Sequence, residues 1–135
     1  FGEVMFSAGC GDGARGAIWE GVAVAGAGGF TPAGNPVANF FAFEESLRNG
    51  CFVAAGDVNG DGFADLILGG GPGGGPRVRI ADGLALLNAT NFVSLDQRLD
   101  LQIGNFFAGD PNTRGGVRVA AKNLDGDGLA DVVAG

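Results

Sequence analysis

The sequence predicts an all-β protein built from four-stranded antiparallel blades of a β-propeller, with about two blades present. Three observations predict this fold: a long internal repeat, short apolar or alternating runs within each repeat, and glycine-rich turns between the runs. Glycine accounts for 28 of the 135 residues, and helical periodicity with caps is missing nearly everywhere. We therefore expect short strands joined by tight turns.

The internal repeat is clearest when the second half of the chain is aligned with the middle at one constant offset. The segment Asn-Phe-Phe-Ala at 39–42 reappears at 105–108, and residues 53–69 match residues 119–135 without gaps. A match over about thirty aligned positions predicts a repeated structural unit, which is the signature of a propeller or an array.

A third and weaker copy occupies residues 3–21, which align with residues 65–83. These copies predict a partial, degenerate blade with strands two to four at 1–49. A full blade follows at 50–115, and the start of the next blade occupies 116–135.

Each full unit is expected to hold four short strands. The apolar runs at 51–55 and 64–68 predict two of them, and the alternation at 77–80 is typical of a half-buried third strand. The phenylalanine-rich segments 40–43 and 106–108 supply the fourth strand in successive units.

Two structural alternatives stay open at this point. Residues 84–87 fit one turn of helix, but the pattern is too short to decide. The whole chain also fits a β-sandwich in which the repetition is accidental.

An acidic motif recurs in the repeat and predicts two metal-binding loops. In both copies, oxygen-bearing side chains occupy loop positions one, three, five and nine, and the carbonyl of position seven adds a further ligand. Oxygen ligands without nitrogen or sulfur favour Ca²⁺. The predicted ligands are Asp57, Asn59, Asp61, Phe63 (carbonyl) and Asp65 in loop 57–65, and Asn123, Asp125, Asp127, Leu129 (carbonyl) and Asp131 in loop 123–131.

The motif differs from an EF-hand, which needs a bidentate Glu at position twelve and flanking helices. Position twelve is Leu68 in one copy and Ala134 in the other, and an apolar run follows each loop. We therefore expect each loop to join two strands. The alternative is an Asp- and Gly-rich hairpin that binds nothing.

The segments 53–69 and 119–135 resemble FG-GAP repeats, the blades of integrin-α-type propellers, and the related VCBS-type bacterial repeats. The family's Phe-Gly pair is less well kept, because Asn49-Gly50 and Gly115-Gly116 occupy its place. The resemblance implies that each loop connects the first and second strands of a blade and binds Ca²⁺. It also implies an extracellular, cell-surface or periplasmic location.

Composition restricts the partners. The net charge of −7 and the pI near 4.2 argue against nucleic acid, which needs a basic face. We expect no transmembrane span, because no run of eighteen apolar residues occurs. About two blades are too few to close a propeller and leave open sheet edges. We therefore expect that the chain is a fragment of a longer protein, or that self-assembly or a protein partner completes the propeller. Trp19 makes a glycan a further candidate ligand.

We expect the chain not to be an enzyme but a calcium-binding extracellular module with a structural or adhesive role. It has no histidine, which excludes Ser-His-Asp triads and His-ligated zinc. Two alternatives are a non-catalytic accessory subunit of a larger membrane-associated assembly and the propeller part of a carbohydrate- or lipid-active enzyme. The two cysteines, Cys10 and Cys51, fit either a disulfide between adjacent blades or two buried thiols.

Overall fold

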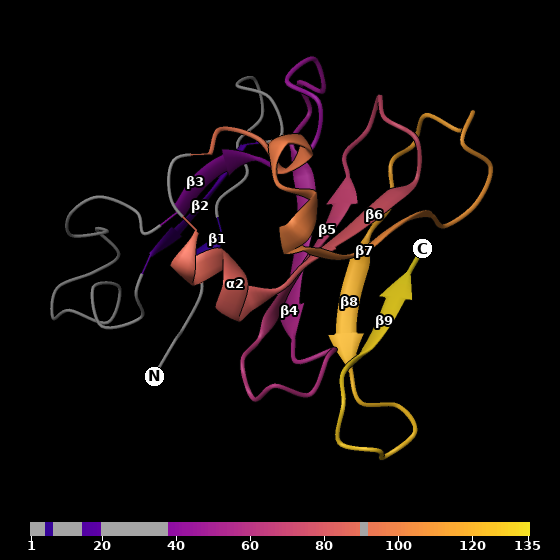
Figure 1. Ribbon diagram of the computed structural model, residues 1–135. Helices are drawn as coiled ribbons and strands as arrows, with labels where there is room; N and C mark the ends of the chain where they lie inside the picture. The colour runs from indigo at the N-terminus through magenta and orange to yellow at the C-terminus, as the bar shows by residue number, and fades with distance from the viewer. Residues whose placement is uncertain (1–4, 7–14, 20–37, 90–91) are drawn as a thin grey trace, which may run out of the picture.

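The computed structural model describes residues 5–6, 15–19, 38–89 and 92–135, and in this part of the chain three antiparallel sheets follow one another (Figure 1). The first sheet holds β1 (Met5–Phe6), β2 (Arg15–Trp19) and β3 (Ala38–Phe41). The second holds β4 (Cys51–Gly56), β5 (Asp65–Gly70), β6 (Arg77–Ala81) and β7 (Gln102–Phe107). The third holds β8 (Val119–Lys122) and β9 (Asp131–Ala134).

The strand order confirms the predicted all-β class. In each sheet the strands are neighbours in chain order, so every connection is a simple antiparallel meander. The four strands of the second sheet lie within the range 50–115, where a full blade is expected. No helix in the described residues is long and apolar enough to cross a membrane.

The sequence repeat is also a repeat of strand register. Val53 lies opposite Leu68 in the β4–β5 pair, and Val119 lies opposite Ala134 at the equivalent place in the β8–β9 pair. The pairs β2–β3 and β6–β7 correspond in the same way, with Arg15 opposite Phe41 in the first and Arg77 opposite Phe107 in the second. Register depends on the alternation of buried and exposed side chains, so a repeated pattern produces a repeated pairing.

Three short helical segments connect β6 to β7. The helix α2 (Gly83–Asn88) forms where the sequence left one helical turn undecided, and it is followed by the 3₁₀ helices η1 (Leu95–Gln97) and η2 (Leu99–Leu101). Asp82 caps α2, since its Oδ1 accepts a hydrogen bond from the Ala85 N–H at 3.0 Å. An Asp cap satisfies an amide that a helix start would otherwise leave unpaired.

The two central strands of the β4–β7 sheet are covered on both faces, and β5 is buried at all six of its positions, whereas the edge strand β7 is mostly exposed. On one face, alternate residues of β5 pack against the segment that follows β3 and against the helical connection. This cluster contains Phe40, Ala42, Phe43, Leu66, Leu68, Ala81, Leu86, Ala89, Leu95 and Leu101. The sheet is therefore covered on this side by apolar side chains from two other parts of the chain.

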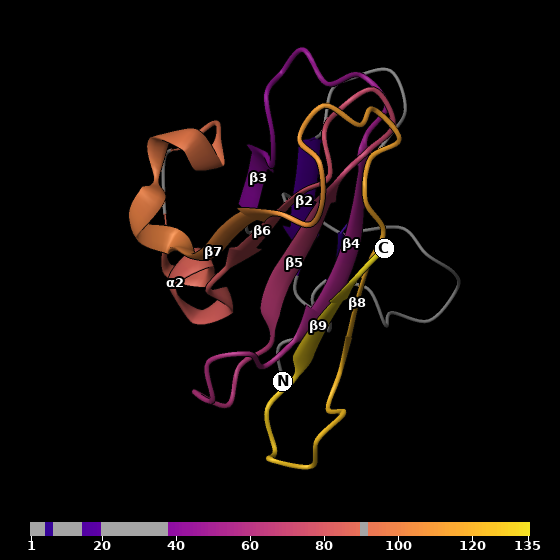
Figure 2. The same cartoon turned by 90° about the vertical axis from the view of Figure 1, so that its right-hand side faces the viewer.

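The other face of the sheet packs against the β8–β9 hairpin. Ile67, Val78 and Ile80 form a buried cluster with Val117, and side chains of β8 and β9 pack onto it. Figure 2 shows the hairpin lying along β4 and β5, as one blade lies on the next in a propeller. Apolar contact between successive sheets thus holds the repeats together.

Arg79 differs from the sequence expectation. The alternation at 77–80 predicted a half-buried strand, but the Arg79 side chain is fully buried. Its guanidinium forms an ion pair with Asp96, donates from Nη1 to the Ala42 carbonyl oxygen at 2.8 Å, and lies 5.3 Å from the centre of the Phe43 ring. A buried charge is tolerated only with such partners, so Arg79 ties the segment after β3 and the η1 helix to the sheet.

Glycine permits the closest approach between the two neighbouring sheets. A Cβ added at Gly69 would lie 2.2 Å from the Val117 carbonyl oxygen. One residue further on, the Gly70 carbonyl oxygen accepts a hydrogen bond from the Val117 N–H at 2.8 Å. The backbone of one blade therefore touches the backbone of the next without a side chain between them.

Cys51 opens β4 and forms no disulfide with any residue that the structure describes, while Cys10 lies outside the described residues. The disulfide considered above therefore stays a prediction. Burial raises the pKa of the Cys51 thiol to about 12, because desolvation disfavours the thiolate.

We expect Gly69→Ala to lower the free energy of unfolding by about 2 kcal/mol, since the new methyl group would overlap the Val117 carbonyl. The matched control is Gly115→Ala, because a Cβ there would meet no atom within 4 Å. The measurement is urea denaturation of both variants. Equal midpoints for the two would contradict the close packing of the blades.

We expect Cys51, in a Cys10→Ser background, to react with iodoacetamide at pH 8 about a hundredfold more slowly in the native protein than in denaturant. The reason is the raised pKa of the thiol, which leaves little thiolate. Because the folded pKa lies above the unfolded value, this group has no effect on stability below about pH 9 and increasingly destabilises the fold as the pH rises towards 12. Equal alkylation rates with and without denaturant would contradict the burial.

Candidate metal centre

Two acidic loops lie at the same end of the molecule. The first joins β4 to β5 and the second joins β8 to β9, and both extend from the lower end of the sheets in Figures 1 and 2. Each loop therefore connects two consecutive antiparallel strands, as the sequence predicted. Their side chains can be followed residue by residue.

Asp57 holds the backbone of the first loop. Its Oδ1 accepts a hydrogen bond from the Gly60 N–H at 2.7 Å, and its Oδ2 accepts one from the Gly62 N–H at 2.9 Å. Both glycines have positive φ angles, 81° and 85°, which side-chain-bearing residues rarely adopt. The alternation of Asp or Asn with Gly thus bends the chain around the first carboxylate of the motif.

Asn59 and Asp61 continue the turn in the same manner. The Asn59 Oδ1 accepts from the Asp61 N–H at 3.1 Å, and the Asp61 Oδ1 accepts from the Phe63 N–H at 2.8 Å. Each side chain bonds the backbone two residues onward, which is the pattern of an Asx turn. The side chain of Phe63, whose carbonyl was predicted as a ligand, is 44% exposed.

Asp65 is the buried member of the predicted ligand set, with 1% of its surface exposed. Its Oδ2 accepts hydrogen bonds from the N–H groups of Val58 at 2.8 Å and Asn59 at 3.3 Å. Its Oδ1 accepts from the Gly83 N–H at 3.0 Å. The carboxylate therefore connects the start of the loop with the start of α2.

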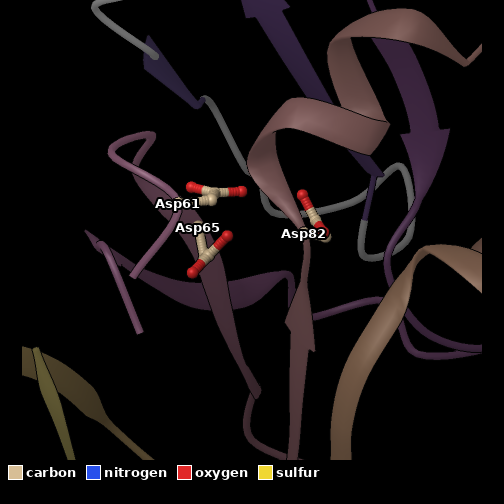
Figure 3. A group of neighbouring side chains, drawn as sticks. All are labelled: Asp61, Asp65 and Asp82. Atoms are coloured by element: carbon tan, nitrogen blue, oxygen red, sulfur yellow. The ribbon is translucent and has the colours of Figure 1, made fainter. Parts of the chain in front are cut away.

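The structure adds Asp82, which sequence reasoning missed. Ligand oxygens of Asp61, Asp65 and Asp82 all lie within 4.8 Å of one another, so these three carboxylates gather between the loop and the start of α2 (Figure 3). The Asn59 side-chain amide also donates to the Asp82 Oδ2 at 3.4 Å. In the sequence, the signal for Asp82 is only that of a helix cap before a short apolar run.

The structure brings together only some of the predicted ligands of the first loop. Of these ligands, the group of three contains Asp61 and Asp65, and within the described ranges no other group of three acidic, cysteine or histidine side chains meets the same distance limit. Asp57 and Asn59 belong to the same loop but bond mainly to its backbone.

The second loop repeats these hydrogen bonds. Each of its side-chain acceptors has a counterpart at the equivalent position of the first loop, and Gly126 and Gly128 again have positive φ angles, 83° and 90°. The bonds run from the N–H groups of Gly126, Asp127, Leu129 and Leu124 to the side-chain oxygens of Asn123 (2.7 Å), Asp125 (3.0 Å), Asp127 (2.8 Å) and Asp131 (2.7 Å). The Asp–Gly pattern therefore builds the same loop twice.

The two loops are also bonded to each other. The Ala130 N–H at the end of the second loop donates to the Asp57 carbonyl oxygen at 2.8 Å. A Cβ added at Gly56 would lie 2.7 Å from the Ala130 Cβ, so the chains are in close contact here. A change in the backbone of one loop can thus alter the other.

The donor chemistry of the three-carboxylate group fits a hard divalent cation. The group offers only carboxylate oxygens, which suit Ca²⁺ or Mg²⁺ and do not resemble the nitrogen and sulfur sets of zinc sites. Three carboxylates within this distance repel one another unless protons, hydrogen bonds or a cation offset the charge. Backbone amides already supply part of that compensation at Asp65.

Comparison with known proteins finds a family similarity that covers the first loop and its flanking strands. Residues 52–80 match the family model of the FG-GAP repeat. The match begins in β4, contains the whole first loop, and ends in β6. It confirms the resemblance for this segment. Neither a curated protein nor a solved structure matches the chain.

We expect Asp65→Ala, measured in the presence of a chelator, to lower the free energy of unfolding by about 3 kcal/mol, because buried backbone amides lose their acceptor. The matched control is Asp131→Ala at the equivalent position of the second loop, where one bond is lost and the cost is about 1 kcal/mol. Chemical denaturation measures both. An effect of Asp65→Ala no larger than that of the control would contradict the role of Asp65 in joining the loop to α2.

Proposed function

We propose that this chain is a calcium-binding extracellular β-propeller segment that serves as a structural and adhesive protein-interaction module. The observation that carries the proposal is the group of Asp61 and Asp65, from a loop that matches the FG-GAP repeat, with Asp82 from the start of α2. The proposed role is binding and not catalysis.

The oxygen ligands at the first loop favour Ca²⁺ binding. Asp61, Asp65 and Asp82 would hold the ion, and Asp57, Asn59 and the Phe63 carbonyl are the further ligands that the motif predicts. Ca²⁺ takes six to eight oxygen ligands in flexible geometries, so it tolerates a mixed set of this kind better than Mg²⁺ does. The ion would offset the repulsion between carboxylates and stabilise the folded loop.

The second loop supports a second, separate site. Asn123, Asp125, Asp127, the Leu129 carbonyl and Asp131 are its predicted ligands, and four of its internal hydrogen bonds repeat those of the first loop.

An extracellular location agrees with weak calcium sites. Extracellular modules commonly bind Ca²⁺ with dissociation constants of about 10⁻⁴ to 10⁻³ M, and such sites fill only where the ion is abundant. The loops are largely exposed to solvent, which favours binding in this weak range.

An interaction role is supported by the outer strands. Ile103, Phe106 and Phe107 of β7 and Val133 of β9 are between 44% and 48% exposed. The propeller blades described here bury their faces against neighbouring blades, so such side chains are suited to contact with a protein partner or another copy of the chain. Such a contact would place further sheets beside these strands and so complete the propeller.

We expect a chelator to lower the melting temperature by about 5 °C and added Ca²⁺ to restore it, because an ion that binds only the folded state stabilises it by mass action. In calorimetric titration, Asp61→Ala should remove the site of the first loop and Asp127→Ala that of the second. The control is Glu45→Gln, an exposed carboxylate outside both loops, which should leave both sites intact. Melting curves that are identical with and without chelator would contradict calcium binding.

A further inference from the structure

A hollow lies at the end of the sheet opposite the acidic loops. The connections from β3 to β4, from β5 to β6 and from β7 to β8 meet there, at the upper end of the sheets in Figures 1 and 2. The hollow has a volume of about 380 Å³, which is within the range of small-ligand sites. We call it the arginine hollow and define it by Glu44, Leu47, Gly74, Arg77, Phe107 and Arg114.

The charge of the arginine hollow is opposite to that of the protein. Two guanidinium groups and one carboxylate line it, whereas the whole chain carries a net charge of −7. Arg77 pairs with Glu44, with 3.0 Å between Nη1 and Oε1, and its Nε donates to the Asn105 Oδ1 at 2.9 Å. Glu44 is thereby neutralised, and the positive charge of Arg114 is left in excess.

A neutral group holds the Arg114 side chain in place, so its positive charge is not compensated. Its Nη1 donates to the Pro111 carbonyl oxygen at 2.6 Å, and a carbonyl carries no net charge. A guanidinium has five N–H donors, and this bond uses one of them. The group is therefore oriented at the hollow with donors left for a planar anion such as a carboxylate, which Arg binds through two parallel hydrogen bonds.

Apolar and glycine surfaces form the rest of the hollow. The Phe107 side chain is 48% exposed and borders the hollow together with Leu47. Glycines let the walls of the hollow approach one another, because a Cβ at Gly74 would lie 3.1 Å from Leu47 Cδ1 and one at Gly75 would lie 2.8 Å from the Pro111 carbonyl oxygen. The site thus combines a cation, an exposed aromatic ring and a glycine-lined wall.

We propose that the arginine hollow binds a uronic-acid sugar, with the carboxylate on Arg114 and the apolar face of the ring against Phe107. An inorganic anion would pair with the Arg114 guanidinium but leave the Phe107 ring exposed to solvent. A neutral sugar would cover the Phe107 ring but leave the Arg114 charge unpaired. A uronate satisfies both, and one sugar ring fits a hollow of about 380 Å³. This site is separate from the acidic loops and does not depend on the proposed calcium function.

The test is calorimetric titration of the full chain, in low salt and without added calcium, with sodium glucuronate, glucose and N-acetylaspartate. We expect glucuronate to bind at least tenfold more tightly than either of the others. Arg114→Gln should weaken glucuronate binding at least tenfold. The matched control is Arg98→Gln, a partly exposed arginine paired with Asp100 outside the hollow, which should leave binding unchanged.

Three results would overturn the proposal. Equal binding of glucuronate and glucose would show that the carboxylate is not recognised, and stronger binding of N-acetylaspartate would assign the hollow to an acidic peptide. Unchanged binding by Arg114→Gln would place the site elsewhere. The ligand comparison uses the unaltered chain, so it holds even if the variant does not fold. Failure of the chelator experiment would remove the calcium proposal alone.

Discussion

The structure depends on the burial of both faces of one β-sheet. The β4–β7 sheet has apolar side chains on each side, and its second strand, β5, is buried at every position. Such a sheet is stable only between two layers that cover it, and here the segment after β3 and the β8–β9 hairpin do so. The blades are therefore units of packing that need their neighbours, and Gly69 matters because it lets two backbones approach each other.

This packing separates the molecule into two chemically different ends. Because the strands alternate in direction, the β4–β5 and β8–β9 turns leave the sheets at one end and bring the aspartates there. The β3–β4, β5–β6 and β7–β8 connections leave at the opposite end, where Arg77 and Arg114 line one hollow. One meander topology thus produces an acidic end with the candidate metal ligands and an opposite end with a positively charged hollow.

Much of the fold could be predicted from the sequence because its signals are local and repeated. The constant offset between the copies carries over into strand register, and the Asp–Gly spacing carries over into loops with positive φ at Gly60 and Gly126. The helix α2 could not be predicted with the same ease, since six residues hold too little periodicity and its cap, Asp82, resembles any loop aspartate. Arg79 was expected in a half-buried strand because alternation does not reveal what covers a sheet.

The sequence by itself determined the repeating strands, the turn glycines and the two acidic loops, since each depends on residues that are close along the chain. Only the tertiary structure decided that Asp82 joins Asp61 and Asp65, and that Glu44, Arg77 and Arg114 share one hollow. The physical reason is that the members of each group come from segments that are far apart along the chain. Their proximity follows from sheet pairing and from apolar packing between blades, which no local pattern encodes.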